Sequence, residues 1–203
     1  MCIRDSSRKW QLAYGVLYGS GPARFAQEIG VTESEARVQI EAFKASVPGV
    51  ERWRKKLIET ASRASPPSVE TICGRRRILS SLAPDAALTA TGCEDAKRRF
   101  RLDRSADERR AVNTACQGSA ADVVKRAMIA VFDELDPSLA TPVLQIHDEL
   151  LFEVDASRVV EAARAVRAII ERAGDEFGFT VPLPVKVSAG ANWGDLVELV
   201  EVL

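Results

Sequence analysis

The stretch "VLQIHDELLFEV", residues 143–154, places a polar triplet between two runs rich in Val, Leu, Ile and Phe. Two short apolar runs around a polar centre are typical of a β-hairpin whose turn carries the polar residues. The triplet is His147, Asp148 and Glu149. Because successive side chains on a strand alternate, Asp148 and Glu149 are expected to point to opposite sides. The pattern therefore predicts a hairpin that presents a carboxylate at or beside its tip.

A single carboxylate at a hairpin tip suits a hard cation such as Mg²⁺, which takes few protein oxygens and leaves positions for water and phosphate. A polar turn that binds no metal would have the same residues. His147 is the only histidine in the chain, which by itself does not separate the two interpretations. The choice between them depends on the other motifs.

Composition sets the outer limits. The chain has 203 residues, 46% of them hydrophobic, and a formal net charge of -1. This size allows one large domain or two small ones. No apolar run approaches the roughly 20 residues of a membrane span, and the first residues lack a signal-peptide pattern, so an intracellular protein without membrane contact is expected. Four scattered cysteines without a C-x-x-C pair suggest neither a zinc site nor a disulfide framework.

The near-neutral total hides local basic runs, "KRRFRLDRSADERR" at 97–110 and "GRRR" at 74–77. Such runs either contact a polyanion or form an ordinary solvated face. Hydrophobic periodicity predicts an α+β fold, mostly helical with a short sheet. Helices are expected over residues 11–30 with an interruption, 32–43, 50–64, 106–135 and 157–173. Extended segments are expected over 70–79, 143–154 and 184–189, and an irregular insertion over 80–96.

Two capping boxes mark expected helix starts, Thr32 with Glu35 and Ser105 with Glu108. Within the long helix, Arg109, Asn113 and Gln117 stand four residues apart and so share one face. An arginine and two amides in line fit nucleic-acid edges and backbones, although a solvated polar stripe would look identical. The expected core stripe of the same helix comprises Ala121, Val124, Met128, Val131 or Phe132, and Leu135.

The stretch "YGVLYGSG", residues 14–21, pairs Tyr14 with Tyr18 and Gly15 with Gly19, each four residues apart. On one helix, the tyrosines would share a face beside a glycine strip, which suits a stacked planar ligand such as a base pair. The alternative is a helix that simply ends in "YGSGP", with Gly19 or Gly21 as its C-cap. That alternative leaves Gly15 unexplained.

In order along the chain, these motifs resemble the family A DNA polymerases. "YGVLYG" is similar to the end of the nucleotide-binding fingers helix, "GRRR" to the arginine turn between fingers and palm, and "ERRAVNTACQGSAADVVKRAM" to the long palm helix. "QIHDELLFEV" resembles the palm hairpin and "VPLPVKVSAGANWGDL" the C-terminal strand and tail. The resemblance implies an incomplete right-hand polymerase fold of the α+β class. It implies a foreign or disordered leader at 1–9, fingers at 10–70 and the C-terminal part of the palm at 71–203.

The resemblance implies template-directed DNA synthesis from dNTPs with two Mg²⁺ ions. Asp148 would be a catalytic metal ligand and Glu149 a secondary carboxylate. Tyr14 and Gly15 would contact the incoming nucleotide, and Tyr18 would stack at the template position. The implied DNA contacts are Arg75, Arg76, Arg109, Asn113, Gln117 and His147. The implied partners are primer-template DNA and dNTPs, bound by a monomer that is cytoplasmic in a bacterium and nuclear or organellar in a eukaryote.

The chain also departs from the family. The fingers helix of the family has a lysine four residues before the aromatic residue at Tyr14, where this chain has Trp10. The motif for the other catalytic aspartate and the thumb are missing, so a C-terminal fragment that cannot polymerise alone is expected. The insertion at 80–96 is longer than usual, and "HDELLFEV" with Tyr14 favours a theta-like or nu-like branch. Two rival interpretations are a non-catalytic nucleic-acid-binding module and a helical interaction protein.

Overall fold

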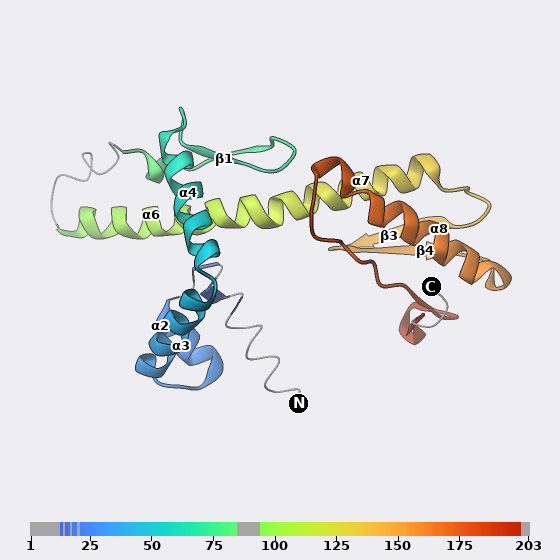
Figure 1. Ribbon diagram of the computed structural model, residues 1–203, viewed down its shortest axis with the longest axis horizontal. Helices are drawn as coiled ribbons and strands as arrows, with labels where there is room; N and C mark the ends of the chain where they lie inside the picture. Colours follow the sequence, from blue (N-terminus) through green and yellow to red (C-terminus); the bar gives the residue numbers. More distant parts are fainter. Residues whose placement is uncertain (1–12, 14, 17, 20, 85–93, 200–203) are drawn as a thin grey trace. The chain divides into compact units, whose positions relative to one another are not determined.

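The computed structural model describes residues 13, 15–16, 18–19, 21–84 and 94–199 (Figure 1). The chain divides into two compact units, Met1–Gly118 and Ser119–Leu203. Helices dominate, and the strands described form three separate two-stranded antiparallel sheets, so the predicted α+β class is confirmed. Within the described residues, no helix is both long enough and apolar enough to span a membrane. The division by packing does not address the fingers and palm boundary at residue 70, which stays a prediction.

The first unit contains three consecutive helices, α2 (Pro22–Ile29), α3 (Glu33–Ser46) and α4 (Pro48–Arg63). The capping box at Thr32 is confirmed. Thr32 Oγ1 accepts a hydrogen bond from the Glu35 N–H at 3.3 Å, and Glu35 Oε2 accepts one from the Thr32 N–H at 2.9 Å. These bonds to Thr32 lower the pKa of the Glu35 carboxyl. A small core, shared by α2 and α3, consists of Val16, Phe25, Ala26, Ala36 and Ile40.

A hairpin of β1 (Ser68–Glu70) and β2 (Arg76–Ile78) follows α4. The prediction of one extended segment over 70–79 is therefore only partly right, because residues 71–75 connect the two strands. A single 3₁₀ turn, η1 (Ser80–Leu82), comes next. Part of the predicted insertion, residues 85–93, lies outside the described residues. The second core of this unit joins α4, the hairpin and the long helix through Ala61, Val69, Leu79, Leu82 and Ala111.

The long helix begins earlier than predicted. It runs as α6 (Glu94–Asn113), a π-helical segment η2 (Thr114–Gly118) and α7 (Ser119–Glu134). The predicted capping box at Ser105 is therefore wrong, because Ser105 lies inside α6. There its Oγ accepts a hydrogen bond from Arg109 Nη1 at 2.8 Å. The residues that precede Ser105 are charged straight-chain helix formers, so nothing in them stops the helix.

In the second unit, α7 packs against α8 (Val159–Arg172). Val131 is buried and Phe132 is 82% exposed, so the core stripe of α7 passes through Val131. Met128, expected in that stripe, is 37% exposed. A helical turn η3 (Ala156–Arg158) leads into α8, as expected for 157–173. The core of this unit consists of Val131, Leu135, Leu139, Ala140, Ala162, Val166 and Ile169.

The strand predicted over 184–189 is much shorter than expected. Only β5 (Ser188–Ala189) is a strand, and it pairs with β6 (Val197–Glu198). Pro184 cannot donate to a ladder, which shortens the strand at its start. Two helical turns, η4 (Asp175–Phe177) and η5 (Trp193–Asp195), complete this unit.

Candidate functional site

The hairpin predicted at 143–154 is confirmed. Strand β3 (Thr141–Ile146) pairs with β4 (Glu149–Glu153), and Ile146 stands opposite Glu149. The register leaves His147 and Asp148 as a two-residue turn. Asp148 thus belongs to the turn and not to a strand, so strand alternation does not fix its direction relative to Glu149.

The turn is built with an unusual residue. His147 has a φ of 53°, the only positive φ outside glycine among the described residues. Two-residue hairpin turns normally place Gly, Asn or Asp at positive φ. The Gln145 amide Nε2 donates a hydrogen bond to the His147 carbonyl, which helps to hold the turn. The turn keeps a strained residue next to the candidate metal ligand.

Asp148 and Glu149 are both exposed. Within the described part of the chain, no hydrogen bond or ion pair engages either carboxylate. No group of three or more His, Cys, Asp or Glu in that same part of the chain could hold a metal. Mg²⁺ is commonly held by one or two carboxylates together with phosphates of a substrate. The free carboxylate of Asp148 fits one ligand position of such an ion, and does not form a complete site.

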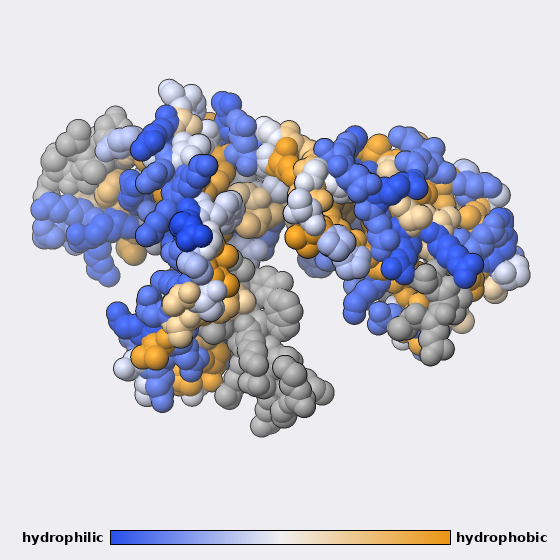
Figure 2. Space-filling model, in the orientation of Figure 1, coloured by the Kyte–Doolittle hydropathy of each residue, from blue (hydrophilic) through white to orange (hydrophobic). Residues whose placement is uncertain are grey.

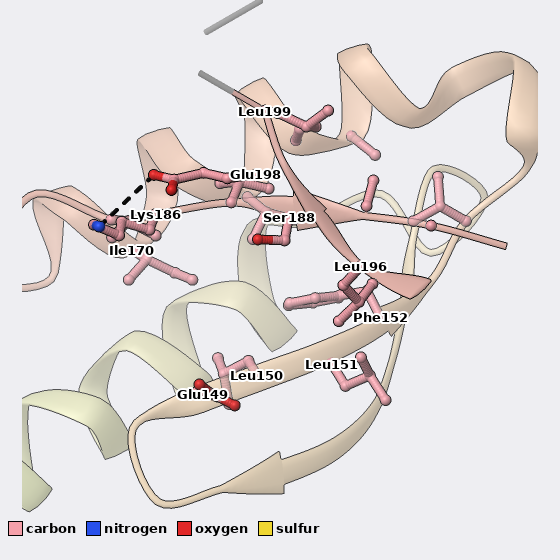
Figure 3. A pocket seen from close by; sticks show the side chains of 18 of the residues that line it. Glu149, Leu150, Leu151, Phe152, Ile170, Lys186, Ser188, Leu196, Glu198 and Leu199 are labelled. Atoms are coloured by element: carbon pink, nitrogen blue, oxygen red, sulfur yellow. Dashed lines mark ion pairs between the residues drawn. The ribbon is translucent and has the colours of Figure 1, made fainter. Parts of the chain in front are cut away.

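Asp148 and Glu149 also line a cavity of about 670 Å³ inside the second unit. Figure 3 shows Glu149 and Leu150 on β4 at one side and the segment of Lys186 and Glu198 at the other. An ion pair of 3.8 Å joins Lys186 Nζ to Glu198 Oε1. Most of the remaining lining comes from apolar side chains of β4, α8 and the C-terminal segment. The cavity therefore places two carboxylates beside a mostly apolar surface.

The row on the long helix lies in the first unit, and Arg109, Asn113 and Gln117 are all exposed. In a regular α-helix, residues four apart drift by about 40° around the axis. The π-helical segment Thr114–Gly118 has wider turns, because its hydrogen bonds span five residues. One turn there takes more than four residues, so the angle between Asn113 and Gln117 around the axis differs from the about 40° of a regular α-helix. Apart from the glycine at 118, no local pattern in the sequence indicates this segment.

The opening stretch is only partly described. Tyr14 lies outside the described residues, whereas Gly15 is helical and half-buried. Tyr18 and Gly19 form a turn, and Gly19 has a φ of 75° with its N–H bonded to the Val16 carbonyl at 3.2 Å. A continuous helix with Gly15 and Gly19 on one strip is therefore wrong. The alternative, a helix that ends at Gly19, is the one observed.

Gly19 lies beside the row on the long helix. A Cβ added at Gly19 would be 3.2 Å from Arg109 Cγ and 3.8 Å from Arg54 Nη2. The close approach, together with the left-handed φ, explains why a glycine stands there. The structure thus brings the opening stretch and Arg109 together within the first unit.

Arg75 and Arg76 bond to the protein itself. Arg75 Nη2 donates to the Gly118 carbonyl at 3.0 Å. Arg76 donates to Glu70 Oε1 from Nε at 3.1 Å and from Nη2 at 2.9 Å. Both arginines are nevertheless exposed. Their predicted contact with DNA stays a prediction. The Arg75 bond joins the hairpin to the long helix, and the Arg76 bonds link β2 to β1.

The candidate residues fall in both units. Those of the fingers stretch, the arginine turn and the long-helix row belong to Met1–Gly118, and those of the hairpin tip belong to Ser119–Leu203. Within the first unit, Gly19 lies beside Arg109 and Arg75 bonds to Gly118. Within the second unit, His147 and Asp148 share one turn. Sequence reasoning missed the contact of Thr71 with Gly118, for which the glycine inside the long helix was the only available signal.

The comparisons with known proteins agree with this architecture. The family model described as DNA polymerase family A matches residues 4–195. The chain belongs to DNA polymerase family A. The POL domain of Pol1 from M. smegmatis, solved in complex with DNA primer-template and dNTP, superimposes with a TM-score of 0.69 at 33% identity. That match covers 87% of this chain and 28% of the other.

Two curated relatives show the range of similarity. The thermostable DNA polymerase I of Thermus filiformis is 38% identical over 89% of this chain and 19% of its own length. The DNA polymerase theta of Drosophila melanogaster is 30% identical over 97% of this chain and 9% of its own length. The chain thus spans about a fifth or less of these relatives. These identities do not favour the theta-like branch over the bacterial one.

Proposed function

We propose that this chain is part of a DNA-directed DNA polymerase that transfers a nucleotidyl group from a dNTP to the 3′-hydroxyl of a primer. The observation that carries the proposal is the exposed two-residue turn with Asp148, in a chain that the family model matches over residues 4–195. In this proposal, residues 10–70 are fingers and residues 71–203 are the C-terminal part of the palm.

Asp148 is proposed as a ligand of Mg²⁺, and Glu149 as a secondary carboxylate. The chemistry that bound Mg²⁺ supplies is activation of the primer hydroxyl and stabilisation of the leaving pyrophosphate. The carboxylate of Asp148 is exposed and has no protein partner in the described part of the chain, so it can accept a cation without losing a bond. One such carboxylate does not position two ions, so the chain alone is proposed to be inactive.

The remaining residues hold the substrates. Tyr14, Gly15 and Tyr18 are proposed to contact the incoming nucleotide and the template base. The amides of Asn113 and Gln117 offer donors and acceptors that suit the minor groove, where acceptor positions are shared by all correct pairs. The other proposed DNA contacts are Arg75, Arg76, Arg109 and His147.

The test is primer extension by a chimera in which residues 11–203 replace the matching segment of the Thermus filiformis polymerase. Asp148→Ala is expected to abolish extension while duplex affinity changes less than about twofold, because an exposed carboxylate is not needed for packing. Glu149→Gln, the matched control one residue away, is expected to retain measurable extension. Extension by the Asp148→Ala chimera would refute the metal assignment. A chimera that binds duplex but never extends a primer would favour the alternative, a non-catalytic nucleic-acid-binding module derived from a polymerase.

A further inference from the structure

The first half of α6 has no structural reason for its positive charge. The buried residues of this helix are Asp107, Ala111 and Val112, so residues 94–106 contribute nothing fully buried to the core. Three arginines in this half, Arg98, Arg99 and Arg101, are exposed. Figure 2 shows hydrophilic residues gathered on this end of α6, at the left of the view.

Three other cations of α6 form ion pairs. Lys97 pairs with Glu94 at 2.9 Å, Arg104 with Glu108 at 3.6 Å and Arg110 with Asp107 at 2.7 Å. Among the described residues, no carboxylate pairs with Arg98, Arg99 or Arg101. The pairs neutralise part of the helix, and the unpaired guanidinium groups concentrate positive potential on the rest.

Two of the three lie on the face of Arg109. Residues 98, 101, 105 and 109 fall within an arc of about 80° at 100° per residue. Arg109 Nη1 donates a hydrogen bond to Ser105 Oγ at 2.8 Å, so two residues of this face contact each other. Arg99 lies about 160° from Arg101 around the helix. We define the basic track as Arg98, Arg101 and Arg109.

We infer that the basic track binds the phosphates of duplex DNA. It would extend the DNA contact proposed for Asn113 and Gln117 toward the N-terminus of α6. The inference rests on the proposed function. Arg98 and Arg109 are about 16 Å apart along the axis. One strand of B-DNA has a phosphate every 3.4 Å of its axis, so the track can face about five phosphates. Guanidinium groups suit phosphate because they donate in a planar fork, and such contacts do not read sequence.

A membrane surface fits this helix less well. An interfacial helix needs a continuous apolar face opposite its basic one. Phe100 and Leu102, the large apolar residues of 94–106, lie about 160° apart around the axis. The first half of α6 therefore has no apolar face to insert.

The experiment compares Arg101→Ala with Arg99→Ala in the 203-residue chain. The two variants remove the same charge, two residues apart, from opposite sides of one helix. Affinity for a fluorescent 20-base-pair duplex is measured by anisotropy from 50 to 200 mM NaCl. Each lost phosphate contact reduces the slope of log K against log salt by about 0.9, which corresponds to an about tenfold loss of duplex affinity at 50 mM salt. Arg101→Ala is expected to lose about tenfold and Arg99→Ala less than twofold, with unchanged circular dichroism.

The double variant Arg98→Ala/Arg101→Ala extends the test. The slope of log K against log salt is expected to be about 1.8 smaller for this variant than for the native chain. The ratio of native to variant affinity therefore falls by about 12-fold between 50 and 200 mM salt. Equal losses for Arg99→Ala and Arg101→Ala would overturn the basic track while leaving the proposed function intact. A chain with no salt-dependent duplex affinity would overturn both. Binding to vesicles with 30% phosphatidylserine that Arg101→Ala weakens, with duplex affinity unchanged, would assign the face to a membrane instead.

Discussion

Gly118 is the point where the β1–β2 hairpin meets the long helix, and Gly118→Ala tests that contact. A Cβ added at Gly118 would be 2.7 Å from Thr71 Cγ2. Ordinary carbon contacts are about 3.5–4.0 Å, so the overlap is roughly 1 Å. Thr71 is only 6% exposed, and its Oγ1 accepts a hydrogen bond from the Arg75 N–H at 3.1 Å. Its side chain cannot rotate away without losing that bond.

The magnitude follows from two opposing terms. Overpacking of this kind costs about 1–3 kcal/mol. Replacing glycine by alanine within a helix returns up to about 1 kcal/mol. Gly118→Ala is therefore expected to lower the free energy of unfolding by about 1 kcal/mol. Thr71→Ser removes Cγ2 and keeps the hydroxyl, so Gly118→Ala in that background is expected to be neutral or stabilising. The sign of the effect thus depends on one methyl group.

The assay is urea unfolding of the four chains of this double-mutant cycle, followed by circular dichroism. A coupling energy of about 1–3 kcal/mol between the two positions is expected, equal to the overpacking term. A higher urea midpoint for Gly118→Ala in the native background would refute the overlap with Thr71. A Thr71→Ser change that fails to restore the stability of the alanine variant would refute it as well.

Three further outcomes are expected. Asp107→Ala leaves the Ser81 N–H without its acceptor at 3.0 Å and should cost about 1–3 kcal/mol in urea unfolding; a loss below 0.5 kcal/mol, an approximate threshold, would contradict this. The hydrogen bond from the Val185 N–H lowers the pKa of Glu171, so its stabilisation is present above about pH 4.5 and is lost as the pH falls through the lowered pKa. Glu171→Gln should thus unfold more easily than the native chain at pH 7 in urea, and this difference should shrink as the pH is lowered below 4.5. His147→Gly should raise the free energy of unfolding by about 0.5–1 kcal/mol, seen as a higher thermal midpoint. A lower midpoint would show that the backbone of His147 is not strained.

Local chemistry explains which elements of the fold could be predicted. The Thr32 box and the polar turn at His147 and Asp148 depend only on neighbouring residues, and both are observed. The start of α6 was missed because a serine followed three residues later by glutamate also fits a helix interior. Ser105 there accepts its hydrogen bond from the Arg109 side chain instead of capping the helix.

Features of the candidate site that depend on residues far apart in the sequence could not be predicted. Arg75 reaches the carbonyl of Gly118, 43 residues away, and no local pattern encodes that pairing. The π-helical segment ends at Gly118, which lies against the side chain of Thr71, the residue that follows β1. The exposed amides were predictable from their spacing, whereas their alignment required the fold.

The positive φ of His147 lowers the stability of this hairpin. A left-handed residue other than glycine costs about 1–2 kcal/mol, and selection for stability alone would place glycine or asparagine at the turn. The hairpin forms because Phe152 and Val154 pack against the core of the second unit, which offsets that cost. Strain that persists beside an unengaged carboxylate is the pattern of functional sites, where surrounding packing over-determines the backbone. His147 stays a proposed DNA contact, and its positive φ gives no stability reason for an imidazole at this turn.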